Sequence, residues 1–102
     1  MTSAELKGKQ FSLSNGITFK VLDVEFYPPS KVSRRNKILL DFEPNQLVAI
    51  DYRGTLIPNI TTEQGVACLK SVEANGKTLT RPKVISAALG ITESKKPELL
   101  QL

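Results

Sequence analysis

Alternating apolar and polar side chains run through residues 9–58 and predict an antiparallel sheet. The clearest case is 37–53, where two alternating segments flank a turn that contains Pro44. Pairing Phe42 with Val48 places the large apolar side chains of both segments on one face. A shift of one residue would instead turn charged groups into the core, which costs solvation energy. We therefore predict a β-hairpin over 37–53.

Another hairpin is predicted at the start of the β-rich region. If its loop holds three residues, 14–16, then Phe11 faces Phe19, and Gly16 takes the left-handed conformation beside a bulge. A two-residue turn would pair Phe11 with Lys20 instead. We favour the three-residue loop because it keeps the apolar side chains together.

The strand that follows this hairpin changes phase. Its first apolar residues share one parity and the next share the other, so a straight strand would expose half of them. A bulge or sharp bend at 21–22 keeps both sets inside, as in small barrels. Pro28 ends the strand because proline has no amide hydrogen to donate. The two sets are Ile17, Phe19 and Val21, and then Leu22, Val24 and Phe26.

The apolar spacing then lengthens to three or four residues and predicts a helix over 62–74. Thr61 and Gln64 have the spacing of a capping box, and the Asn75-Gly76 pair is a typical stop signal. The apolar stripe of this helix would be Val66, Leu69 and Val72.

A second helix is predicted over 82–89. Pro82 suits its first turn, and Gly90 suits a left-handed residue after its end. Residues 83–92 also resemble the first helix and turn of the helix-turn-helix family, which would imply DNA recognition by a following helix. Pro97 would fall inside that following helix, so we favour a helix that docks on the sheet. Its apolar face would be Val84, Ile85, Ala88 and Leu89.

Together these patterns predict an α+β fold. We expect a strongly bent antiparallel sheet or partial small barrel, with two hairpins and four to five strands, followed by two C-terminal helices. Residues 1–102 are expected to form a single domain. Within it we expect a flexible leader over 1–8, a β-rich part over 9–58, a helical part over 59–91 and a tail over 92–102.

The composition of the chain indicates the cellular compartment in which we expect it. The chain has no apolar run near the roughly 18 residues that a membrane span needs, and its first residues lack the apolar segment of a secretory signal. Cys68 is its single cysteine and has no internal disulfide partner, which fits a reducing compartment. We expect a cytoplasmic protein without membrane association.

The sequence contains no histidine. This removes Ser-His-Asp and Cys-His nucleophiles, and also the histidine ligands of most catalytic zinc sites. No metal-ligand spacing and no glycine-rich phosphate loop is present. We therefore expect a protein that is not an enzyme, with no catalytic residue, metal or cofactor.

A basic loop over 31–37 is the leading candidate for function, because it contains cations and no acid. An aromatic residue lies just upstream, and cations beside an aromatic ring suit phosphate contact and base stacking. We predict weak binding of RNA or DNA, while the plainer alternative is a solvated loop that only aids solubility. The expected contact residues are Tyr27, Lys31, Arg34, Arg35 and Lys37.

The alternative function is a protein–protein adaptor or a homo-oligomer. The tail over 98–102 is rich in leucine, and those leucines have no place in the predicted helix pattern. Either this tail or an exposed sheet edge would then contact a protein partner or a second copy of the chain.

Overall fold

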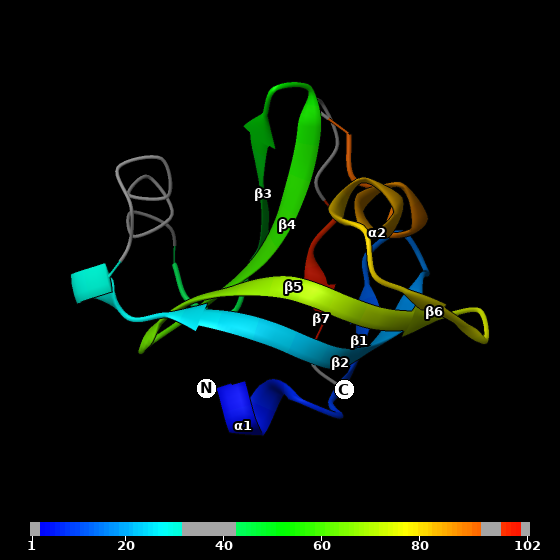
Figure 1. Ribbon diagram of the computed structural model, residues 1–102. Coiled ribbons are helices and arrows are strands. Elements are labelled where there is room, and N and C mark those ends of the chain that lie inside the picture. Colours follow the sequence, from blue (N-terminus) through cyan, green and yellow to red (C-terminus); the bar gives the residue numbers. More distant parts are fainter. Residues whose placement is uncertain (1–2, 32–42, 93–96, 101–102) are drawn as a thin grey trace.

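The computed structural model describes residues 3–31, 43–92 and 97–100, which build a curled antiparallel sheet with the shape of a half-barrel (Figure 1). Six of its seven strands follow the order β3-β4-β5-β2-β1-β7, and the seventh, β6, pairs with β5 outside that path. The strands are β1 (Gln10–Leu13), β2 (Thr18–Tyr27), β3 (Leu47–Tyr52), β4 (Thr55–Thr62), β5 (Gly65–Ala74), β6 (Lys77–Leu79) and β7 (Leu99–Leu100). The helical elements are α1 (Ser3–Leu6), the 3-10 helix η1 (Pro29–Lys31) and α2 (Pro82–Ala88).

The predicted α+β class is wrong. The described chain is mainly β, and α2 is the one C-terminal helix within it. The helix predicted over 62–74 is the end of β4 followed by β5, and the helical part expected over 59–91 contains strands β4, β5 and β6 before α2. Asn75 and Gly76 have positive φ values of 52° and 74° and form the tight turn from β5 to β6 rather than a helix end.

The error over 62–74 has a physical cause. Residues 65–69 of β5 are all buried, because this half of the strand is covered on both faces. Val66 belongs to a small apolar cluster on one face of the sheet, whereas Leu69 belongs to the main core on the other. A strand that is buried on both faces loses the two-residue alternation, so its apolar spacing imitates a helix.

The first hairpin follows the predicted three-residue loop. Phe11 pairs with Phe19, and their ring centroids lie 5.6 Å apart. The Leu13 amide donates to the Ile17 carbonyl oxygen over 2.8 Å, and Gly16 has a φ of 88°. The loop register therefore keeps the two phenylalanines together in the core.

The predicted phase change also occurs, and it is shared by two strands. The ladder between β2 and β5 shifts register between Val21 and Val24, and both of these residues are buried. On β5, Leu69 and Val72 lie on either side of the same shift and both belong to the core. Because both strands bend at one place, the sheet curls there instead of remaining flat.

Pro58 determines where β4 leaves β5. Strand β4 pairs with β3 over 55–60 but with β5 only over 59–62. The alternation along β4 directs the backbone of Pro58 toward β5, and proline has no amide hydrogen to donate. Helix α2 packs on β4. The Ser86 hydroxyl donates to the Leu56 carbonyl oxygen, which lies on the edge of β4 that no longer pairs with β5.

Helix α2 begins and ends largely as predicted. Pro82 stands at its first position, Gly90 has a φ of 75°, and the Ile91 amide donates to the Ser86 carbonyl oxygen over 2.9 Å. Its predicted apolar face is wrong at Val84, which is 44% exposed, while Ser86 is buried. Because β7 follows as a strand, the structure does not continue the resemblance to a helix-turn-helix.

The leader predicted over 1–8 is wrong at Leu6, whose side chain is fully buried in the core. The Gly8 amide donates to the Val21 carbonyl oxygen over 2.7 Å, and the Val21 amide donates to the Lys9 carbonyl oxygen over 2.9 Å. The segment after α1 is therefore held against β2.

The hairpin predicted over 37–53 is described only in its second half. Residues 37–42 lie outside the described residues, and the second half is β3. Strand β3 pairs with β4 through a two-residue turn, in which Arg53 and Gly54 have φ values of 53° and 84°.

Candidate functional site

The basic loop predicted to bind nucleic acid is described only in part. Tyr27 ends β2, and Lys31 ends η1 with an exposed side chain. Arg34, Arg35 and Lys37 lie outside the described residues. Binding of RNA or DNA through these residues therefore stays a prediction.

Tyr27 lies beside an acid rather than among cations. Its side chain forms a hydrogen bond with Glu25, and Lys70 Nζ lies 3.1 Å from Glu25 Oε2. The hydrogen bond from Tyr27 lowers the pKa of Glu25, as do the hydrogen bond and charge of Lys70. Burial raises the pKa of Tyr27, and the hydrogen bond to Glu25 raises it further. The phenol is thus held next to a negative charge, which disfavours phosphate nearby.

The outer face of the sheet carries charges of both signs. Lys20 of β2 pairs across the ladder with Glu73 of β5, and Lys7 Nζ lies 3.4 Å from Asp23 Oδ1. Lys70 of β5 likewise lies beside Glu25 of β2. The cations that lie on β2 and β5 are therefore balanced by acids and do not extend the basic loop.

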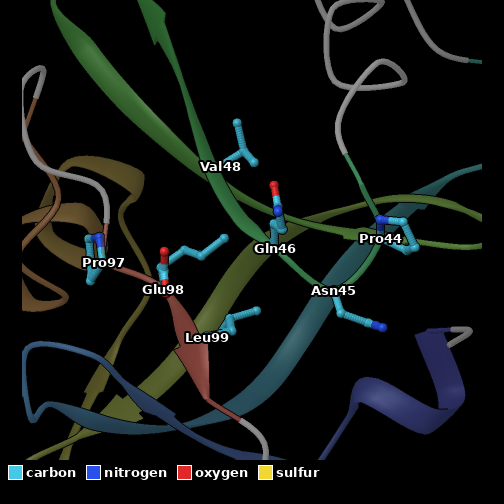
Figure 2. Close-up of a pocket in the computed structure, with 8 residues that line it drawn as sticks. Pro44, Asn45, Gln46, Val48, Pro97, Glu98 and Leu99 are labelled. Atoms are coloured by element: carbon cyan, nitrogen blue, oxygen red, sulfur yellow. The ribbon is translucent and has the colours of Figure 1, made fainter.

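A cavity of about 410 Å³ lies between the two ends of the curled sheet (Figure 2). One wall consists of residues 44–48 at the start of β3, and the other consists of residues 97–99 at the start of β7. We call this cavity the seam. Because β3 and β7 stand at opposite ends of the main strand order, the seam is the gap at which the half-barrel stays open. Its volume falls within the range of ordinary ligand sites.

Thr61 of β4 holds the first wall in place and is itself 2% exposed. Its Oγ1 donates to the Glu43 carbonyl oxygen over 2.7 Å and accepts from the Gln46 amide over 3.0 Å. Its carbonyl oxygen accepts from the Asn45 amide, and its amide donates to the Gln46 carbonyl oxygen. Two residues of this wall thus face one residue of β4, which is a bulge, and Asn45 takes a φ of 67°.

Ser14 holds the second wall. Its amide donates to the Glu98 carbonyl oxygen, and its Oγ accepts from the Glu98 amide, both over 2.9 Å. Next to this contact Leu13 pairs with Leu99, whose side chain packs against the core. The tail predicted as a free contact surface is therefore joined to β1 over 98–100.

Strand β3 has a free edge, because within the described chain it pairs with β4 alone. Tyr52 and Thr55 flank the two-residue turn, so this pair exchanges hydrogen bonds, and every second residue of β3 does the same. The amides and carbonyls of Leu47 and Ala49 then point away from β4. They face the side on which the seam lies.

Strand β7 has the complementary arrangement. Ser14 and Glu98 exchange hydrogen bonds, so the next residue, Leu99, directs its amide and carbonyl away from β1. Figure 2 shows the two walls facing each other across the cavity. Both sides of the seam are thus sheet edges that offer backbone donors and acceptors.

The seam has little chemistry for catalysis. Glu98, which is exposed, is the ionisable residue among those that line it. Elsewhere in the described chain, no three Cys, Asp or Glu side chains gather as a metal site would require. Burial raises the pKa of the Cys68 thiol, which keeps it in its unreactive form.

No family model, curated protein or solved structure matches the chain. Among the helices of the described residues, none has the length and apolar character needed to cross a bilayer. The function is therefore inferred from the geometry of the seam.

The sequence pointed to only part of this site. The leucines of the tail and an exposed sheet edge are the predicted protein contacts, and both Leu99 and β3 belong to the seam. The sequence predicts neither the contact of Ser14 nor that of Thr61, which it assigns to a helix cap, because a hydroxyl that bonds to backbone across the fold has no signature in one sequence. The sequence feature that comes closest to predicting this wall is Pro44 followed by Asn45, two turn-forming residues just before β3.

Proposed function

We propose that this chain is a non-catalytic protein-interaction domain, and that its seam accepts an extended segment of a partner protein. The observation that carries this proposal is the open gap between β3 and β7, both of whose walls are sheet edges. Strand addition is an established mode of peptide recognition, in which backbone hydrogen bonds supply affinity.

An extended segment suits the seam better than a compact small molecule. The outward groups of Leu47 and Ala49 repeat every second residue along one edge. A peptide strand presents donors and acceptors with that same repeat, and its side chains alternate between the two faces of the sheet. One set of side chains would then meet the core beside Leu99.

The direction of such a segment follows from the strand order. Neighbouring strands along the path from β3 to β7 are antiparallel, so β3 and β7 run in opposite directions. A strand between them is antiparallel to one wall and parallel to the other. Strand β3 is six residues long and β7 is two, so the segment pairs antiparallel with β3, which is also the more stable arrangement.

The test uses amide NMR with the heptapeptide acetyl-Thr-Val-Thr-Val-Thr-Val-Thr-amide as probe. We expect saturable shifts at the amides of Leu47, Ala49 and Leu99 at peptide concentrations up to about 2 mM. Ala49→Pro removes an outward donor without breaking a bond to β4, so it should weaken binding at least fivefold. The matched control is Thr78→Pro, which removes the outward donor of the β6 edge and should leave binding unchanged.

Two results would overturn the proposal. One is the absence of saturable shifts at the seam. The other is slow hydrogen exchange of the Ala49 amide in the free protein, because this would show that residues such as 37–43 of the chain already occupy the edge. We expect the Ala49 amide to exchange faster than the amides of Val48 and Ile50, which bond to β4.

Nucleic-acid binding through the loop over 31–37 remains the second candidate, supported by its acid-free sequence and the exposed side chain of Lys31. Filter binding with RNA and single-stranded DNA tests it. The double variant Arg34→Glu and Arg35→Glu should lose most of any affinity at low salt. Equal affinity of the variant and the parent chain would remove this candidate.

A further inference from the structure

We infer that the seam selects partner segments with consecutive apolar residues, rather than segments in which apolar and polar residues alternate. This inference rests on the proposed function and names the chemistry of the partner. It is carried by the apolar side chains that both walls of the seam present on both faces of the sheet.

Strand β3 is apolar on both faces where it borders the seam. Leu47 and Ala49 belong to the main core, whereas Val48 packs with Val66 in a separate cluster. Ile50 is half-buried and packs against that second cluster. Three successive residues at the start of this edge are therefore buried, although their side chains point in alternate directions.

The second cluster lies on the outer face of the sheet. Val48 pairs with Asn59, Asn59 pairs with Cys68 of β5, and Cys68 pairs with Glu25 of β2, which is exposed. Residues that pair directly across strands share a face, so this row stands on the face opposite the core. Unlike the part of this face that carries Glu25, the part beside the seam is apolar.

The apolar part of the β3 edge is short. Asn45, before it, is exposed, and Asp51, after it, is exposed and accepts from the Gly54 amide over 2.9 Å. The apolar stretch therefore covers 47–50. Three consecutive apolar side chains of a paired segment fit beside it, whereas three alternating ones span five residues, so one of them falls outside.

The far wall also has an apolar side chain on each face. Leu99 packs against the core, whereas Leu100 pairs with Ser12 and is 46% exposed. Because successive residues of a strand alternate, Leu100 lies on the outer face. Glu98 precedes Leu99 on that same face and is exposed, so the apolar part of this wall is short too.

A segment paired with β3 therefore has apolar neighbours whichever way its side chains point. Side chains of one parity stand beside Leu47 and Ala49, and those of the other stand beside Val48 and Ile50. A polar side chain next to buried Val48 would lose water without gaining a hydrogen-bond partner. Strands covered on both faces carry continuous apolar runs for this reason, as β5 does over 66–69.

The experiment compares two heptapeptides of identical composition by amide NMR. One is the alternating probe acetyl-Thr-Val-Thr-Val-Thr-Val-Thr-amide. The other, acetyl-Thr-Thr-Val-Val-Val-Thr-Thr-amide, has its three valines in succession. Length, charge and composition are the same, so only the pattern differs. We expect the consecutive peptide to bind about fivefold more tightly, because one more valine is covered.

The variant Ile50→Thr removes apolar surface from the outer face and keeps a β-branched residue in the strand. It should reduce the advantage of the consecutive peptide to about twofold and leave the alternating peptide unchanged. The matched control is Ile57→Thr, because Ile57 is also half-buried and pairs with Ile50 on the same face, but stands one strand away from the edge. It should leave the advantage intact.

The variant Leu100→Thr repeats the test on the far wall, at an exposed position where the change does not threaten the fold. It should lower the affinity of the consecutive peptide about twofold. Its control is Val84→Thr, which changes a similarly exposed side chain on α2 and should alter neither affinity.

The outcomes separate this inference from the proposed function. If the alternating peptide binds at the seam as tightly as the consecutive one, the preference is wrong while strand addition stands. The same holds if Ile50→Thr and Leu100→Thr both leave the ratio of the two affinities unchanged. If neither peptide binds at the seam, the proposed function fails, and this inference fails with it.

Discussion

At the scale of single residues, Gly65 is the position least able to accept a side chain. Its φ is 149°, and a Cβ atom there would overlap the Tyr27 carbonyl oxygen and lie 2.9 Å from Pro28 Cα. Both obstacles are backbone atoms, so no rotamer change relieves them. The close approach lets β5 begin directly beside the end of β2.

We expect Gly65→Ala to lower the free energy of unfolding by about 3 kcal/mol, combining backbone strain with overpacking. Gly54→Ala is the control, because Gly54 also has positive φ but its Cβ would meet no atom within 4 Å. It should cost only about 1 kcal/mol. Urea denaturation measures both, and equal losses would show that the contact with 27–28 is unimportant.

The ionisable network on the outer face gives a prediction about pH. The pKa of Glu25 is lowered by the hydrogen bond from Tyr27 and then by Lys70. A carboxyl whose pKa is lower in the folded state contributes stability above its unfolded value of 4.5, and this is lost as pH falls through the folded value. The Glu25 side chain is 52% exposed, so the effect is small.

Replacing Tyr27 by phenylalanine should move the pKa of Glu25 upward, and Lys70→Met should do the same. Carbon-detected NMR titration of the Glu25 carboxyl measures both shifts. A Glu25 titration that is identical in Tyr27→Phe and the parent chain would contradict the hydrogen bond.

At the scale of elements, Thr61 joins β4 to the first wall of the seam through its side chain and backbone. Thr61→Val keeps the shape but leaves the Gln46 amide and the Glu43 carbonyl oxygen without this partner. We expect a loss of about 1–3 kcal/mol and faster exchange of the Gln46 amide.

The control for this variant is Thr55→Val at the other end of β4. Thr55 is half-buried, and no side-chain hydrogen bond is described for it, so the loss should stay below about 0.5 kcal/mol. If Thr61→Val weakens stability but leaves peptide binding at the seam unaltered, the wall does not depend on this hydroxyl.

The elements that the sequence predicted correctly have local causes. The loop over 14–16 depends on Gly16, which tolerates positive φ, and the phase change near 21–24 is visible in the apolar pattern. The start of α2 follows from Pro82. In each case a few neighbouring residues decide the conformation.

The element that failed, 62–74, depends on the rest of the chain. Whether Val66 lies on a helix or on a strand covered on both faces is decided by β2 and β4, which pair with β5 on either side. The Asn75-Gly76 pair was compatible with a helix end and with a hairpin turn. Only the pairing of β5 with other strands distinguishes a helix end from a hairpin turn at this position.

At the scale of the whole molecule, the sequence predicted the curvature of the sheet but not the position of its gap. The bend in β2 indicated a partial barrel, and the half-barrel agrees with that. The seam, however, lies between residues 44–48 and 97–99, which meet only because the sheet curls over the four strands that stand between β3 and β7. A site formed by the two ends of a sheet leaves no local motif in the sequence.

The position of Cys68 has a practical consequence for anyone who studies this chain. It is the single thiol, it is buried, and it sits on β5 between Glu25 of β2 and Asn59 of β4. A thiol-specific dye can reach it only when the middle of the sheet comes apart. The rate of labelling therefore reports how often the centre of the sheet opens in the unmodified protein. No engineered probe is needed for this measurement.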